Sequence, residues 1–181
     1  MTSSRGATFA VPQEVARLTQ EHLRAKGQEM SEGVVLWLGT FEPPRITRAV
    51  VPEQETSMGR FRVPLRARQE LSRELTGSGQ VLVAQVHSHP SAAFHSEVDD
   101  AEAIPRRAGA YSLVLPDFGA RAHLLEGAAL YRLDQSGRWL DAPLSTFSIS
   151  DSLATLMPVT RKRTLWRRLT DLLRSSGRSS I

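Results

Sequence analysis

The stretch Val81-Leu-Val-Ala-Gln-Val-His-Ser-His-Pro90, continued by Ser91-Ala-Ala-Phe-His-Ser-Glu-Val-Asp-Asp100, carries the strongest structural signals in the chain. Its first six residues are mostly apolar, which predicts a buried strand over 81–86. Pro90 bends the chain just beyond that strand. Ser96 suits the N-cap of a helix, and the acidic residues after it suit the positive end of the helix dipole. We therefore predict a strand, a short loop and a helix that begins after Ser96.

The sequence on either side predicts further strands and helices that would pack on this unit. Helices are expected over 12–26 and 65–75, where apolar residues recur at helical spacing and glycines follow the last turn. Apolar or alternating runs predict strands over 32–39, 45–51 and 111–115, with the second antiparallel to the first, and a hairpin over 120–125 and 128–133. The polar residues 53–60 are predicted to form a loop. The fold class expected is α+β (α/β), a central mixed sheet flanked by helices.

The two ends of the chain differ in character from this folded part. We expect a flexible N-terminus over 1–10, a domain over 11–142 and a C-terminal extension over 143–181. Within that extension, residues 160–174 place leucines at helical spacing between six basic residues, which predicts a basic amphipathic helix. We favour leucines packed on the sheet with arginines in solvent over docking to nucleic acid or an acidic membrane.

Composition limits the chemistry that the chain can perform. The 181 residues include no cysteine, so disulfides, thiolate metal sites and a cysteine nucleophile are excluded. No apolar run approaches the roughly 18 residues that a membrane-spanning helix needs. The N-terminus lacks the apolar segment of a secretory signal, and we expect a cytoplasmic protein.

His87 and His89 are the first candidates for chemistry. Residues two apart point to opposite faces of a flat strand, but at a strand end that bends at Pro90 they can converge on one ion. Imidazole suits zinc, and a carboxylate from the following helix can complete three ligands and leave one position open for water. Turn or core histidines are the competing interpretation of such a pair. Three of the five histidines fall between positions 87 and 95, which favours a metal.

The full pattern resembles a known family of metallopeptidases. Glu32 opens the apolar run Glu32-Gly-Val-Val-Leu-Trp-Leu-Gly39, and the chain continues to His87-Ser-His-Pro90 and Ser96-Glu-Val-Asp99. This is similar to the motif of JAMM (JAB/MPN) metallopeptidases, and the resemblance spans roughly 11–133. It implies a JAB/MPN-type fold and one Zn²⁺ per chain held by His87, His89 and Asp99.

The same resemblance implies roles for two further residues. Glu32 would deprotonate the catalytic water and then protonate the leaving nitrogen. Ser96 would donate its hydroxyl to the developing oxyanion, and the same hydroxyl can also serve as a plain helix cap.

The loop between the histidines and the helix departs from the family pattern. Six residues separate His89 from Ser96, one fewer than the family usually has. The Ser-x-x-Asp spacing selects Asp99 as third ligand, whereas the distance from the histidines selects Asp100. We choose Asp99, because it shares a rigid helical turn with Ser96 and Asp100 would point about 100° away. His95 could be a loop residue, a substrate contact or a fourth ligand, and we favour the loop residue.

The resemblance also implies a substrate class. Many members of the family cut after the C-terminus of ubiquitin or ubiquitin-like proteins, and the short chain looks like a compact bacterial branch found with ubiquitin-like conjugation systems, several of them anti-phage. A ubiquitin-like protein or its conjugate would be the partner, with 53–60 clamping its tail, and E1/E2-like conjugation enzymes would be further partners. Two alternatives stay open, a metal-dependent hydrolase of other amides and a non-catalytic binding module.

Overall fold

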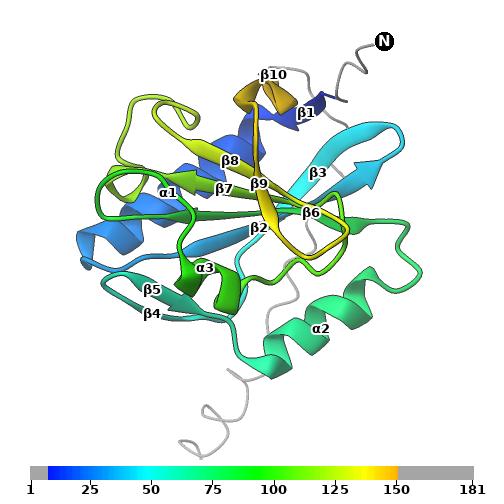
Figure 1. Cartoon of the computed structure of the whole chain (residues 1–181), viewed down its shortest axis with the longest axis horizontal. Helices are drawn as coiled ribbons and strands as arrows, with labels where there is room; N and C mark the ends of the chain where they lie inside the picture. The colour runs from blue at the N-terminus through cyan, green and yellow to red at the C-terminus, as the bar shows by residue number, and fades with distance from the viewer. Residues whose placement is uncertain (1–7, 151–181) are drawn as a thin grey trace, which may run out of the picture.

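The central strands of the protein are two apolar segments that lie next to each other, β2 (Val34–Phe41) and β6 (Val81–Ser88). The computed structural model describes residues 8–150, and these strands occupy the middle of an eight-stranded mixed sheet of order β10-β1-β3-β2-β6-β7-β8-β9 (Figure 1). The other strands of this sheet are β1 (Phe9–Pro12), β3 (Pro44–Val50), β7 (Tyr111–Leu115), β8 (Ala129–Leu133), β9 (Trp139–Ala142) and β10 (Phe147–Ser150). A separate hairpin consists of β4 (Glu55–Ser57) and β5 (Arg60–Arg62).

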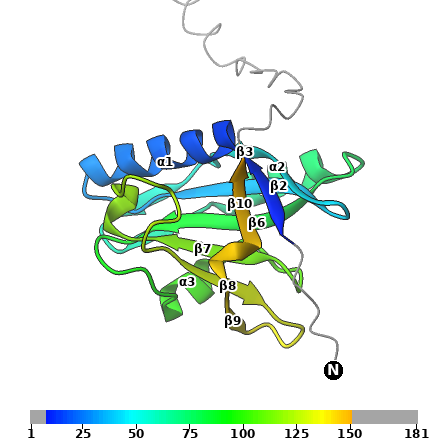
Figure 2. The same ribbon diagram turned by 90° about the horizontal axis from the view of Figure 1, so that it is seen from above.

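Within residues 8–150, three α-helices and two short 3-10 helices accompany the strands. They are α1 (Gln13–Gln28), α2 (Leu65–Leu75), α3 (Glu97–Glu102), η1 (Asp117–Gly119) and η2 (Leu144–Thr146). Figure 2 shows α1 and α3 on opposite sides of the large sheet.

Side-chain alternation along β2 gives the sheet two buried faces. Val35 and Trp37 pack into one apolar cluster with Leu23 of α1, while Leu36 and the residues two away from it pack with Phe61 of the hairpin and with α2. Because successive side chains of a strand point to opposite faces, one apolar run supplies buried side chains to the clusters on both faces of the sheet. This explains why the run in β2 is continuous rather than alternating.

Strand register brings the beginning of β2 beside the end of β6. The two strands are antiparallel with Val34 opposite His87, and the Ser88 N–H donates to the Gly33 carbonyl at 3.3 Å. On its other side β6 runs parallel to β7 with Ser88 opposite Leu115. Glu32 immediately precedes this pairing. It therefore lies at the same end of the two central strands as the His87-Ser-His89 segment.

The predicted mixed sheet flanked by helices is confirmed. The helix over 65–75 and the strand over 111–115 have the predicted bounds, and β3 is antiparallel to β2 as expected. The helix after Ser96 also forms, with Ser96 at its N-cap.

Two predicted segments were wrong. No strand forms over 120–125 in the described chain. This segment instead forms turns beside α1, and the Gln20 side chain of α1 donates a hydrogen bond to the Arg121 carbonyl at 2.6 Å. The hairpin partner of β8 is β9 instead. In the turn between them, the Asp134 carboxylate accepts hydrogen bonds from the N–H groups of Ser136 and Arg138 at 2.8 and 2.9 Å. Residues 53–60 are not a plain loop, since they include β4 and the start of β5, joined at Gly59, whose φ of 77° suits glycine.

The sheet reaches beyond the predicted range 11–142 at both ends. β1 and β10 pair in parallel, with Phe9 opposite Phe147, and these two side chains are 1% and 3% exposed. The pairing is non-local, so neither end shows it in its own sequence. The predicted basic helix over 160–174 lies outside the described residues. Among the helices that the structure describes, none has the length and apolar character needed to cross a membrane.

Candidate metal centre

Asp99 is held in place by a reciprocal cap at the start of α3. Its carboxylate Oδ2 accepts from the N–H of Ser96 at 2.7 Å and from the Ser96 hydroxyl at 2.8 Å. The N–H of Asp99 donates back to the Ser96 hydroxyl oxygen at 3.2 Å, which completes a capping box. These contacts within Ser-x-x-Asp orient the Asp99 carboxylate through residues of the same helical turn.

The two histidines lie against that carboxylate. Nε2 of His87 is 3.2 Å from Oδ1 of Asp99, and Nε2 of His89 is 3.3 Å from Oδ2. One potential ligand atom from each of the three residues lies within 4.8 Å of the others. The residues are 0%, 5% and 3% exposed in the order His87, His89, Asp99. The structure thus brings together the three residues that the sequence predicted as ligands.

The hydrogen bonding of His87 fits a cation at this point. Neither of its ring nitrogens has a hydrogen-bond partner among the described residues, although both are buried, so the 3.2 Å contact with Asp99 is not an aligned N–H donation. Buried polar atoms are almost always satisfied in folded proteins. Two imidazole nitrogens and one carboxylate oxygen are donors that zinc accepts. The donor set therefore fits a divalent metal better than it fits an internal hydrogen bond.

Burial and charge set the protonation states of the cluster. Burial lowers the pKa of His87 despite the opposing influence of Asp99, so its ring is neutral and keeps a lone pair. Burial also lowers the pKa of His89, but the contact with Asp99 and the negative charges of Asp99 and Glu32 together outweigh burial, and the pKa is raised. Burial raises the pKa of Asp99, yet His87 and His89 together bring that pKa well below its ordinary value. Asp99 is therefore an ionised carboxylate facing two imidazoles.

Glu32 lies beside the cluster and has the opposite tendency. Its N–H donates to the Ser57 carbonyl at 3.0 Å, which ties the residue to the β4–β5 hairpin, and it is 3% exposed. Burial raises the pKa of Glu32 to about 7, with His89 lowering it and Asp99 raising it. A carboxyl group with a pKa near 7 can both accept and release a proton at neutral pH. Such a pair of carboxyl groups with separated pKa values is a common arrangement at catalytic sites.

Asp100 and His95 lie next to the cluster but outside it. The Asp100 side chain is 59% exposed, and its Oδ1 is 3.1 Å from Nδ1 of His95. The His95 ring lies 5.1 Å from the rings of both Tyr131 and Trp139. His95 belongs to the loop as expected, but its side chain is only 5% exposed. The sequence carries no local signal for these neighbours, because they come from β8 and β9.

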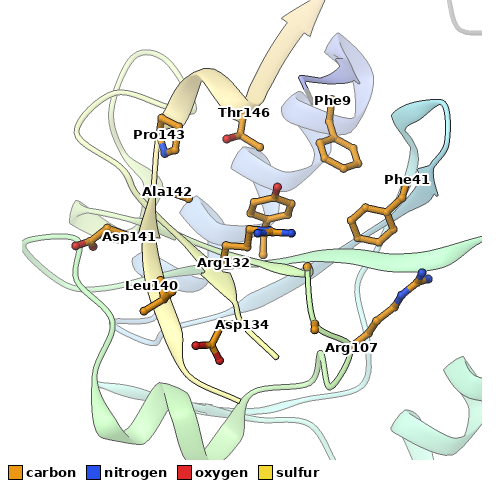
Figure 3. Close-up of a pocket in the computed structure, with 13 residues that line it drawn as sticks. Phe9, Phe41, Arg107, Arg132, Asp134, Leu140, Asp141, Ala142, Pro143 and Thr146 are labelled. Carbon is orange, nitrogen blue, oxygen red and sulfur yellow. The ribbon is translucent and has the colours of Figure 1, made fainter. Parts of the chain in front are cut away.

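A separate hollow of about 570 Å³ opens elsewhere on the sheet (Figure 3). Aromatic and arginine side chains line it, among them Phe9, Phe41, Arg107 and Arg132. It lies at the Tyr111 end of β7, whereas the metal-ligand cluster lies at the opposite end of the neighbouring β6. None of the five predicted site residues contributes to it, so donor chemistry and not cavity size locates the candidate site.

Comparison with known proteins finds a metalloprotease relative and solved structures of similar fold. No family model matches the sequence. The probable metalloprotease y4jG from Sinorhizobium fredii (strain NBRC 101917 / NGR234) is 37% identical over 142 residues, covering 75% of this chain and 88% of that protein. The solution structure of protein DSY2949 from Desulfitobacterium hafniense superposes with a TM-score of 0.59 at 16% identity, covering 81% of this chain and 96% of that one. A JAB1/MPN domain protein from Archaeoglobus fulgidus matches with a TM-score of 0.45 at 16% identity, covering 80% of this chain and 100% of that one.

The fold and the site together define the class of protein: a mixed sheet with a buried His–His–Asp cluster at the end of a central strand. The identity to the metalloprotease relative, over most of both chains, shows common descent. Together with the motif of Glu32, His87-Ser-His-Pro90 and Ser96-Glu-Val-Asp99, this relationship means that the chain belongs to the JAMM (JAB/MPN) metalloprotease family.

Proposed function

We propose that the protein is a zinc-dependent peptidase that cleaves the peptide or isopeptide bond after the C-terminus of a ubiquitin-like protein. The observation that carries the proposal is the convergence of His87, His89 and Asp99 beside the buried carboxyl group of Glu32. A cluster that served only to stabilise the fold would have no use for a second carboxyl group with a pKa near neutrality.

Zinc is the proposed metal because of the donors. His87 and His89 would each supply Nε2 and Asp99 a carboxylate oxygen, which leaves one position free, as in catalytic zinc sites. When bound, zinc lowers the pKa of water to near 7 and polarises a carbonyl oxygen. The chain supplies no thiolate, which removes the softer alternatives.

Glu32 is the proposed proton carrier. Its carboxylate would take a proton from the attacking water and deliver it to the leaving nitrogen of the cleaved amide. Both transfers need a group whose pKa lies near the working pH, and burial gives Glu32 that property. The Glu32 N–H bond to the Ser57 carbonyl and the pairing of Val34 with His87, two residues further on, would hold it near the cluster.

Ser96 is the proposed donor to the oxyanion that forms on the substrate. Its hydroxyl donates to Asp99 at 2.8 Å, so it would have to turn toward the substrate oxygen during the reaction. The Ser96 N–H at 2.7 Å from the same carboxylate oxygen would keep Asp99 oriented during that turn. The hydroxyl can therefore serve both as cap and as transition-state donor.

The surroundings of the cluster support an extended peptide tail as substrate. The β4–β5 hairpin, tied to Glu32 through Ser57, is a two-stranded ladder, and an extended peptide can be added to the edge of such a ladder. Exposed apolar side chains border the site, including Phe94, whose ring lies 4.7 Å from that of His89. The proposal extends to removal or maturation of a ubiquitin-like modifier, with E1/E2-like enzymes as its conjugating partners and anti-phage defence as a setting, on the strength of the family resemblance alone.

A cleavage assay with matched variants tests the proposal. Zinc-loaded full-length protein is incubated with a ubiquitin-like protein that carries a C-terminal fusion, and the products are identified by mass spectrometry. Wild type and the exposed control Glu70→Gln should release the fusion after the last modifier residue, while Glu32→Gln should bind zinc and fail to cleave. Equal cleavage by Glu32→Gln would overturn the assignment of the base. Cleavage only of unrelated peptides or amides would replace the substrate class, and zinc binding without any hydrolysis would favour a binding module.

A further inference from the structure

His95 is held on several sides, which a simple loop residue would not need. Its ring packs at 5.1 Å against Tyr131, with an interplanar angle of 54°, and at 5.1 Å against Trp139, with an angle of 38°. Both contacts join the loop before α3 to the far end of the sheet. The ring therefore has a fixed position and a fixed edge direction.

The position of Asp100 favours one protonation state of the His95 ring. Nδ1 of His95 lies 3.1 Å from Oδ1 of Asp100. A neutral imidazole carries a single proton, and a carboxylate oxygen beside Nδ1 attracts that proton to Nδ1. Nε2 is then a bare acceptor, and it is buried without a hydrogen-bond partner among the residues of the described chain.

His87 has the complementary deficiency. Its Nε2 faces Asp99 and would have to be unprotonated to bind a metal, so its single proton would be on Nδ1. That Nδ1 is also buried and has no partner within the part of the chain that the structure describes. The His87 and His95 rings lie 6.3 Å apart between centroids, at an interplanar angle of 76°. One ring thus lacks an acceptor and its neighbour lacks a donor.

We propose that His95 and Asp100 together form a supporting pair for His87. Asp100 keeps the His95 proton on Nδ1, and one bridging water molecule accepts a hydrogen bond from Nδ1 of His87 and donates one to Nε2 of His95. Nε2 of His87 is thereby kept unprotonated and aimed at the metal. The inference rests on the proposed metal site, and it makes His95 and Asp100 positioning residues that contact neither metal nor substrate.

This role separates the two neighbouring aspartates. Asp99 faces the two ligand histidines, whereas Asp100, one residue further around α3, faces the ring that supports one of them. Metal-ligating histidines generally donate their second nitrogen to a carboxylate, carbonyl or water, and loss of that partner typically costs about 10- to 100-fold in metal affinity.

Zinc affinity measured by chelator competition tests the pair with four variants. His95→Phe keeps a ring between Tyr131 and Trp139 but has no acceptor, and it should weaken zinc binding about 10- to 100-fold. His95→Gln keeps an amide oxygen and should recover part of that loss. Asp100→Asn should lie between wild type and His95→Phe, while the exposed control Asp141→Asn should bind as wild type. Equal affinity of wild type and His95→Phe would overturn the inference.

Nitrogen chemical shifts of the histidine rings give a readout that does not depend on metal or on activity. In the metal-free protein near pH 7.5, His95 should be the Nδ1–H tautomer, and Asp100→Asn should move its proton toward Nε2. An Nε2–H tautomer or an imidazolium at His95 would contradict the pair even if zinc binds. Wild-type protein that binds no zinc but shows this tautomer would overturn the proposed function and leave the pair intact.

Discussion

Ser96 and Asp99 cap each other across the first turn of α3, with the Asp99 carboxylate accepting two hydrogen bonds from Ser96 at 2.7 and 2.8 Å. This contact fixes the direction of the third proposed ligand. The position of the carboxylate relative to His87 and His89 therefore depends on a single serine.

Replacement of Ser96 should affect stability and turnover separately. Ser96→Ala removes the cap and should lower the free energy of unfolding by about 1 kcal/mol, measured by urea denaturation of the metal-free protein. It should also lower kcat about 100-fold or more if the hydroxyl stabilises an oxyanion. Ser96→Thr keeps a capping hydroxyl and should retain most of the stability. Full turnover by Ser96→Ala would leave the serine with a capping role alone.

Asp99 and Asp100 should differ in metal content. Asp99→Ala removes the carboxylate that faces both histidines and should leave the purified protein without stoichiometric zinc. Asp100→Ala should still reach one zinc per chain when the metal is supplied in excess. Elemental analysis after gel filtration distinguishes the two, and the reverse pattern would show that the spacing from the histidines, rather than the Ser-x-x-Asp turn, selects the ligand.

The raised pKa of Glu32 predicts a pH-dependent stability of the metal-free protein. An ordinary glutamate has a pKa of 4.5, and burial raises that of Glu32 to about 7. Between these values the folded protein binds more protons than the unfolded chain, so this residue makes stability fall as pH rises from about 4.5 to 7. Glu32→Gln lacks this titration. As pH rises across that window, the free energy of unfolding of Glu32→Gln should therefore increase relative to that of wild type. The expected increase is on the order of 1–3 kcal/mol once solvent screening is allowed for.

Denaturant titrations of both proteins at pH 5 and pH 8 provide the measurement. Asp99 does not titrate in this range, because its lowered pKa keeps the carboxylate ionised from pH 5 to pH 8 in both proteins. A constant difference between the two proteins at the two pH values would mean that the Glu32 carboxyl group is solvated like an ordinary one.

A buried polar pair in the core should be sensitive to loss of either member. The Trp37 indole N–H donates to the Thr19 hydroxyl at 2.8 Å, and both residues are 0% exposed. Thr19→Val leaves the indole N–H without a partner and should cost about 1–3 kcal/mol in thermal or urea unfolding. In a double-mutant cycle, Thr19→Val should cost less in a Trp37→Phe background, and strictly additive effects would show that the bond adds nothing.

Local sequence signals predicted the elements whose stabilising contacts are local. The helix over 65–75 has its own apolar face, and the Ser96–Asp99 turn contains its own cap, so both could be read directly. The cluster of His87, His89 and Asp99 was predicted from the resemblance to the JAMM motif, while the residues alone indicated only that a strand end and the next helix start could share an ion.

The errors and omissions involve partners that are distant in the sequence. The strand expected over 120–125 does not form, and side chains of α1, about a hundred residues earlier, donate hydrogen bonds to the carbonyls of Ala120 and Arg121. The β1–β10 pairing joins the two ends of the described chain, and the neighbours of His95 come from β8 and β9. No window of the sequence contains both members of any of these contacts.

X-ray absorption at the zinc edge is the sharpest test of a zinc ion held by His87, His89 and Asp99. The account predicts one zinc per chain with two imidazole nitrogens and one carboxylate oxygen at about 2.0–2.2 Å, and loss of one imidazole from the spectrum of His89→Ala. A protein that binds no zinc, or a spectrum without imidazole scattering, would contradict it.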